Sequence, residues 1–151
     1  MNNPFEILKK NRALILKITN DLTLEQLNKI PNSFGNNIIW NMAHLAVIQQ
    51  ILCYKLSGLP IHVSDDMASK YMKGSRPTVG VSQTEVDEIK ELFISLPNQF
   101  EKDYNANAFK EYEAYTTSLN VTLVDIDTAI AFNNFHEGIH LGVILALKKL
   151  V

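Results

Sequence analysis

The segment from about Asn37 to Leu56 restricts the fold of this chain more than any other. Its apolar residues recur at helical spacing, with Trp40, His44 and Ile51 among those on one face. The opposite side of this helix is also fairly apolar. A helix that is apolar on both sides must be covered on both sides by other parts of the protein, so we predict that it is well buried.

Three further segments have the apolar spacing of long helices. The first runs from about Pro4 to Thr19, and the last from about Asp125 to Leu150. Between them, a helix that begins near Ser82 keeps its spacing through Pro97, where we expect a kink. A short turn or helix is expected at residues 23–31, and no convincing set of alternating strands is present.

The predicted fold class is therefore all-α, a four-helix bundle that forms one domain over residues 1–151. Residues 59–81 are expected to form an irregular, long crossover after the second long helix, because Gly, Pro, Ser and Asp punctuate them. Residues 108–122 are expected to form a loop or a short strand whose aromatic side chains pack over one end of the bundle.

Composition excludes several classes of protein. The net charge is −2 and no Lys/Arg cluster is present, so we expect neither a nucleic-acid surface nor a membrane surface as the main function. The single cysteine, Cys53, allows no disulfide within the chain and no cysteine-rich zinc site. No apolar run approaches the roughly 20 residues of a membrane span, and the first residues lack the pattern of a signal peptide. We therefore expect a cytoplasmic protein.

The stretch NNFHEGIH, residues 133–140, contains two histidines four positions apart, with a glutamate directly after the first. On a helix, four steps of about 100° place His136 and His140 about 40° apart on one face. The apolar residues that share this face indicate that it points inward; they include Ala129, Val143, Ile144 and Leu147. Two inward imidazoles are costly to bury without partners, and one divalent cation would satisfy both.

The same stretch has the H-E-x-x-H spacing of zinc peptidases, but the rest of the chain does not support a peptidase. Such sites usually take a third ligand further along the chain, and no His, Asp, Glu or Cys follows His140. A third ligand must then come from upstream. His44, on the buried face of the second long helix, is a better candidate than His62, which we expect to be a solvated loop residue. Three histidines would leave an open coordination position, as catalytic metal sites do.

Three segments of the chain resemble the DinB-like (YfiT-like) metalloenzyme family. IIWNMAHL, residues 38–45, resembles the W-x-x-x-H-[IL] segment of that family, and HEGIHLGVILALKK, residues 136–149, resembles its closing H-x-x-x-H-x-G-Q-[IL] helix. NVTLVDIDTAI, residues 120–130, resembles the stretch that leads into that helix, so the resemblance covers essentially the whole chain. Val143 stands where the family commonly has Gln, so a polar contact made by that glutamine is not expected here.

The resemblance implies an up-down-down-up helical bundle that is often a homodimer. It implies one divalent metal ion, commonly zinc or nickel, held by His44, His136 and His140. The residues alone leave the metal open, because three imidazoles also accept cobalt or iron. Relatives include transferases and isomerases that use a low-molecular-weight thiol, and some hydrolases. We therefore expect a thiol-dependent S-transferase that acts on a small-molecule substrate, with such a thiol as co-substrate.

Two alternatives stay open from the sequence. A metal-dependent hydrolase would use Glu137 as its base, since this residue lies about 60° around the helix from His140, although it could equally be salt-bridged at a helix interface. The second alternative is a metal-binding module without catalysis. In the crossover, Tyr71, Lys73 and Arg76 are candidate substrate contacts, set against the simpler expectation of a solvated loop.

Overall fold

The computed structural model describes residues 3–151, and most of them are helical, which confirms the predicted all-α class. The four long helices are α1 (Pro4–Thr19), α3 (Ile38–Cys53), α5 (Gln83–Asn105) and α6 (Ile126–Lys148). The shorter elements are α2 (Leu24–Asn28), the 3-10 helix η1 (Lys55–Ser57), α4 (Asp65–Tyr71), and the strands β1 (Tyr115–Thr116) and β2 (Thr122–Leu123). None of the described helices is both long enough and apolar enough to cross a membrane.

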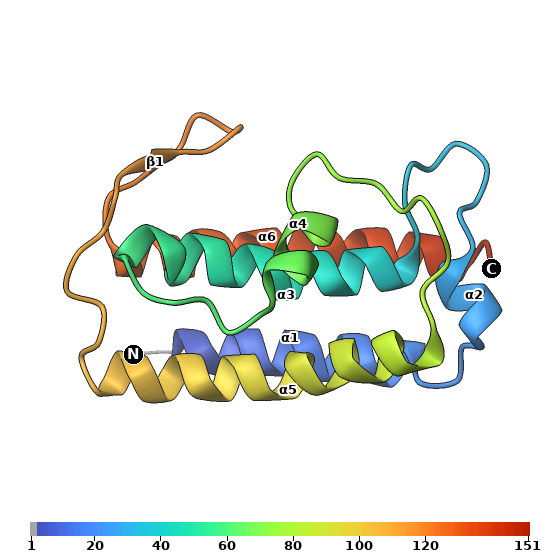
Figure 1. Ribbon diagram of the computed structural model, residues 1–151, viewed down its shortest axis with the longest axis horizontal. Helices are drawn as coiled ribbons and strands as arrows, with labels where there is room; N and C mark the ends of the chain where they lie inside the picture. Colours follow the sequence, from blue (N-terminus) through green and yellow to red (C-terminus); the bar gives the residue numbers. More distant parts are fainter. Residues whose placement is uncertain (1–2) are drawn as a thin grey trace.

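The four long helices lie along a common direction (Figure 1). Helices α1 and α6 run from left to right in this view, and α3 and α5 run from right to left. Each long helix packs mainly against two of the others, through the pairs α1–α5, α1–α6, α3–α5 and α3–α6. This arrangement gives α3 a long contact with α6, the helix that carries the histidine pair.

Local signals explain where the site-bearing helices begin and end. The side chain of Asn37 accepts a hydrogen bond from the backbone N–H of Trp40 and so caps α3. After η1 the chain turns at Gly58, whose φ of 70° lies in the left-handed region that glycine adopts without strain. Asp125 and Thr128 form a reciprocal capping box at the start of α6. Helix α5 is one continuous element across Pro97, as its apolar spacing predicted.

The crossover between α3 and α5 is more ordered than the sequence indicated. Residues 59–81 contain α4, which begins after a Ser64 cap and contacts α3. Met67 and Tyr71 are its buried residues. Seven residues between turn-forming stretches are too few to show a helical period, which is why sequence patterning gave only an irregular segment.

A small antiparallel hairpin occupies part of the segment for which the sequence left loop and strand open. Tyr115 pairs with Leu123, and Thr116 pairs with Thr122. The hairpin contacts α6 through β2 and lies to one side of α3 and α6, at the upper left of Figure 1.

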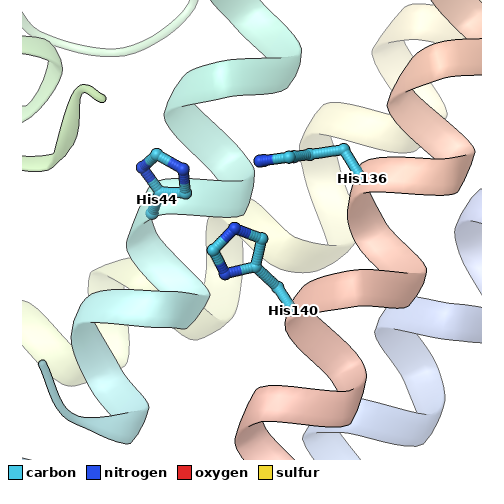
Figure 2. Close-up of side chains that lie close together, drawn as sticks. All are labelled: His44, His136 and His140. Carbon is cyan, nitrogen blue, oxygen red and sulfur yellow. The ribbon is translucent and has the colours of Figure 1, made fainter. Parts of the chain in front are cut away.

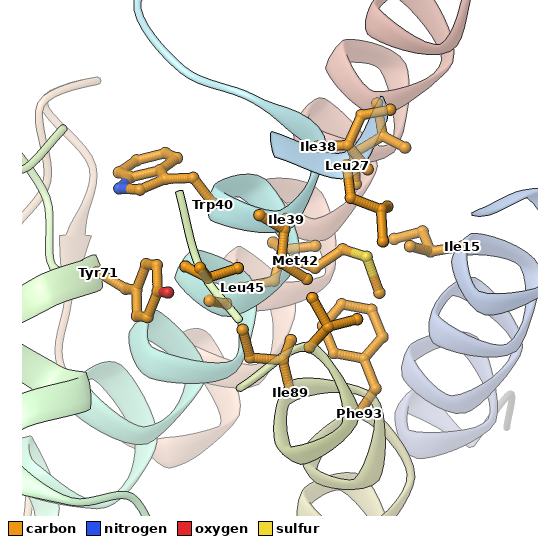
Figure 3. Packing of buried hydrophobic residues seen from close by; sticks show 14 of the residues in the cluster. Ile15, Leu27, Ile38, Ile39, Trp40, Met42, Leu45, Tyr71, Ile89 and Phe93 are labelled. Carbon is orange, nitrogen blue, oxygen red and sulfur yellow. The ribbon is translucent and has the colours of Figure 1, made fainter. Parts of the chain in front are cut away.

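The hydrophobic core surrounds α3, which is buried along nearly its whole length, as predicted. Figure 3 shows Met42 of α3 together with Ile15 of α1, Leu27 of α2, and Ile89 and Phe93 of α5. A second cluster continues the core toward the other end of the bundle, around Phe5, Leu52 and Phe100. The backbone that carries His44 is therefore held by packing on every side of α3.

Candidate metal centre

His44, His136 and His140 converge in the space between α3 and α6 (Figure 2). His44 projects from α3, and the other two project from successive turns of α6. Each ring offers one nitrogen, and these three nitrogens all lie within 4.8 Å of one another. The three residues predicted as a group from sequence thus lie together. His62 lies elsewhere, with its ring against Tyr54 and its Nε2 3.9 Å from Asp103.

Hydrogen bonds fix the orientation of two of the rings. Nδ1 of His44 lies 2.7 Å from the backbone oxygen of Tyr71, and Nδ1 of His140 lies 2.7 Å from Oδ1 of Asn41. Both partners are acceptors, so each Nδ1 carries the proton and donates it. The Nε2 atom of each ring then keeps its lone pair, which is the arrangement that histidine ligands of metals usually adopt.

Asn41 is itself held in place by two donated hydrogen bonds. Its Nδ2 lies 2.7 Å from the backbone oxygen of Asn37 and 2.9 Å from Oδ1 of Asn36. These bonds leave its carbonyl oxygen directed at His140. Nδ1 of the third ring, His136, is buried and has no hydrogen-bond partner among the described residues. This ring is therefore the least constrained of the three.

Burial keeps all three imidazoles in their neutral form. It lowers the pKa of His136 to about 3, with smaller contributions from His140 and His44. It lowers the pKa of His140 to about 4, helped by the nearby His44. The pKa of His44 is also lowered by burial, partly offset by its hydrogen bond to Tyr71. Neutral imidazoles bind divalent cations, so the donor set fits a divalent metal ion.

A pocket of about 520 Å³ opens over the three histidines. Its size lies within the range of about 300–1,000 Å³ that small-molecule sites occupy. Its remaining walls come from α3 and η1, from the residues after α4, from the hairpin and from Phe132 of α6: Ile48, Ile51, Leu52, Leu56, Met72, Lys73, Tyr115, Thr117 and Ser118. None of these lining residues is Asp, Glu or Cys, so no side chain of the pocket offers a fourth ligand of those kinds. A fourth position would thus be available to a small molecule.

Glu137 lies outside this pocket, although it follows His136 directly. Its side chain is 1% exposed and forms a salt bridge with Arg12, whose Nη2 lies 2.8 Å from Oε1. Asn11 donates a further hydrogen bond of 3.2 Å to Oε2. The carboxylate therefore faces α1. Of the two roles that the sequence left open for Glu137, this geometry favours the salt bridge at a helix interface.

Arg12 connects α1 with the other three long helices. Besides Glu137 of α6, its Nη2 donates to the backbone oxygen of Leu45 of α3 at 3.1 Å. Its guanidinium also lies 4.8 Å from the ring centroid of Phe93 of α5. The guanidinium thus ties Glu137, and with it the turn of α6 that carries His136, to the rest of the bundle.

The three candidate substrate contacts of the crossover lie in different places. Lys73 lines the pocket over the histidines. Tyr71 is buried and its hydroxyl donates to Glu85, while its backbone oxygen accepts the hydrogen bond from His44. Arg76 lines a separate, small cavity beside Trp40. This placement supports a substrate contact for Lys73 and does not support one for Tyr71 or Arg76.

The comparison with protein families identifies the chain. A model of the DinB superfamily matches residues 7–144, which include all three histidines and parts of all four long helices. The chain belongs to the DinB superfamily. No match to it was found among curated proteins. Superfamily membership confirms the resemblance that the two histidine segments carry.

Two features set this DinB protein's site apart from what its motifs alone indicate. Val143 packs partly buried against the hydrophobic core, so the polar contact of a glutamine is absent at that position. Asn41 provides a polar contact to His140 from α3 instead. A buried asparagine within a largely apolar helix was a signal for such a role, and the sequence-based prediction did not include it.

Proposed function

We propose that this DinB protein is a divalent-metal-dependent enzyme that transfers a small-molecule thiol to an electrophilic substrate. One observation carries the proposal: three neutral, inward-facing imidazoles lie at the base of a pocket that no protein carboxylate or thiol enters. A structural metal site would be closed by a fourth protein ligand, whereas an open position suits an enzyme. A metal-binding module without catalysis accounts for the histidines but gives no role to the pocket.

The residues of the chain have separable tasks in this proposal. His44, His136 and His140 would hold the ion, and the hydrogen bonds that His44 and His140 donate to Tyr71 and Asn41 keep two of the rings in position. A divalent ion bound there would act as a Lewis acid and lower the pKa of a thiol in the open position. The aliphatic wall from α3 would exclude water from the reacting groups.

The reacting thiol would come from a co-substrate, because the chain has no suitable thiol of its own. Cys53 is fully buried, and burial raises the pKa of its thiol well above the usual range. A cysteine in such surroundings is an inert packing residue. This supports the proposed low-molecular-weight thiol, whose sulfur would attack an electrophile held in the pocket.

The hydrolase alternative receives less support from the geometry. It needs a base close to the open coordination position, and its candidate was Glu137. That carboxylate is held by Arg12 and Asn11 on the side of α6 that faces α1.

We also propose that the four long helices form the up-down-down-up bundle with a long crossover after α3, in a cytoplasmic homodimer. The directions of the helices in Figure 1 support the bundle topology. Exposed apolar side chains on α1 and α6 support the dimer, since they would otherwise lie in water: Ile7, Leu14, Phe135 and Ile139.

A conjugation assay tests the proposed reaction. Glutathione and 1-chloro-2,4-dinitrobenzene would serve as probe thiol and probe electrophile; sulfur forms a bond to the ring carbon, chloride leaves, and the thiol proton passes to the buffer. Metal-loaded protein should accelerate the reaction, and a His136→Ala variant should not. Equal rates with and without the protein, across several thiols and electrophiles, would argue for a metal-binding module instead.

A further inference from the structure

We propose that the pocket over the histidines selects an organic acid, with an apolar body against its walls and one anionic group paired with Lys73. This inference rests on the proposed function, because it names the substrate class for the same pocket. It is carried by the charges and walls of the pocket and by the way in which Lys73 is held.

The charge of the pocket is positive and uncompensated. Lys73 is the one lysine or arginine among the lining residues, and no aspartate or glutamate lines the pocket to neutralise it. Lys73 forms no salt bridge with any described residue, whereas Lys9, Lys70 and Lys148 each pair with a carboxylate. Neutral imidazoles would leave the charge of a bound divalent ion uncompensated as well. The charge of Lys73 and the charge of a bound ion would both favour an anionic ligand over a neutral or cationic one of the same shape.

The walls between these charges are apolar. Ile48, Ile51 and Leu52 line one side, and Phe132 and Met72 line others. Binding sites of this kind gain affinity from the apolar body of a ligand and take its orientation from a few polar groups. Lys73 is exposed and lines the pocket, so the residue lies at its rim, from where its ammonium group would orient an acidic group. The rest of the ligand would then extend toward the histidines.

The backbone around Lys73 is tied to the metal centre. The oxygen of Tyr71, two residues earlier, accepts the hydrogen bond from His44. Two residues later, the hydroxyl of Ser75 lies 3.3 Å from Nε1 of Trp40 and donates to the oxygen of Met72 at 2.8 Å. Gly74, at a φ of 87°, allows the sharp turn between these contacts. Because both flanks are anchored to α3, Lys73 is presented to the pocket by a fixed backbone.

Three ligands of equal chain length test this selectivity: octanoate, 1-octanol and octylammonium at pH 7. Binding can be followed through Trp40, the single tryptophan of the chain, whose ring stacks on His44 with centroids 4.6 Å apart. The variants are Lys73→Gln and Lys73→Glu, with Lys102→Gln, an exposed lysine on α5, as matched control. Each protein is measured after metal removal and after metal loading, and its metal content is determined on the same sample.

We expect octanoate to bind most tightly to the wild type and to the control. Lys73→Gln should weaken octanoate by up to about fivefold, as expected for a partly exposed ion pair, and leave octanol unchanged. In the metal-free protein, Lys73→Glu should make octylammonium the preferred ligand. Equal affinity of the wild type for octanoate and octanol would overturn the inference, as would an equal loss for both in Lys73→Gln.

The metal content separates this inference from the proposed function. If the octanoate preference depends on Lys73 but no metal binds, the enzyme proposal fails and the ligand selectivity stands. If metal binds with the expected stoichiometry but charge has no influence on ligand affinity, the substrate class is wrong and the metal site stands.

Discussion

Removing the buried arginine of α1 should destabilise this protein far more than removing an exposed lysine of the same helix. Arg12 and Glu137 are each 1% exposed, and their salt bridge lies between α1 and α6. Arg12→Met would leave the Glu137 carboxylate buried with only Asn11 as partner, and would remove the hydrogen bond to Leu45. Breaking a buried pair from one side costs about 3–5 kcal/mol, so we expect a loss of that size in the free energy of unfolding.

Lys9→Met provides the matched control. Lys9 of α1 also pairs with a carboxylate on a neighbouring helix, Glu101 of α5, but the two side chains are 35% and 26% exposed. Solvent screens such a pair, so its loss should cost less than about 1 kcal/mol. Both variants can be compared by urea denaturation followed by circular dichroism.

The double variant Arg12→Met/Glu137→Met separates the buried charge from the lost packing. It should recover most of the stability that Arg12→Met loses, because no unpaired charge then remains in the core. Nη1 of Arg12 is buried without a partner among the described residues, which further limits what the intact pair contributes. If Arg12→Met costs no more than Lys9→Met, or if the double variant is less stable than the single one, the reasoning is refuted.

Three further predictions concern the metal centre and the assembly. Asn41→Leu should weaken metal binding by about 10–100-fold in a chelator competition, because it removes the hydrogen-bond acceptor for His140. Asn41→Asp should retain most of the metal affinity. Equal metal affinities of the wild type and Asn41→Leu would contradict this role of Asn41. In metal-free protein, the pKa values of His136 (about 3) and His140 (about 4) are lowered in the folded state. As the pH falls, these two histidines therefore take up protons in the unfolded chain before they do so in the folded protein. The free energy of unfolding should therefore be greatest above the ordinary histidine pKa of 6.5 and should fall as the pH decreases from there through about 4 to about 3. A His136→Phe/His140→Phe variant should show a flatter pH profile in urea denaturation. Matching pH profiles for the two proteins would count against this prediction. Phe135→Glu should convert a dimer into a monomer in light scattering, and a wild-type monomer at high concentration would exclude the proposed homodimer.

The long helices could be predicted because their signals are local. Apolar spacing and capping residues such as Asn37 and Asp125 act within one or two turns, so they can be recognised without knowing the fold. Helix α4 could not be predicted in the same way, since it depends on the burial of Met67 and Tyr71. Ser64 gives a local start signal for this helix, but seven residues are too few to show an apolar period.

The candidate ligands could be predicted, while their partners could not. His136 and His140 share a helix face by spacing alone. His44 adds the third imidazole because it lies on the buried face of the second long helix, and the resemblance to the family implies the same ligand. Tyr71 reaches His44 through its backbone oxygen, which any residue type would provide, so its identity gave no signal.

Arg12 is a different case, because its position did carry a signal. It lies between Leu8 and Ile15 on the buried stripe of the first helix, and a charged residue there requires a partner of opposite charge. The sequence also supplied that partner in Glu137, on the last helix. Only the packing of α1 against α6 shows that the two meet.

Elemental analysis of the untagged protein, beside a His44→Ala variant, tests the three-histidine metal centre most directly. We predict about one zinc or nickel ion per chain in the wild type and a large loss in the variant, with circular dichroism showing that the variant keeps its helices. Absence of bound metal even after addition of zinc or nickel would contradict the account, as would equal metal content in the two proteins.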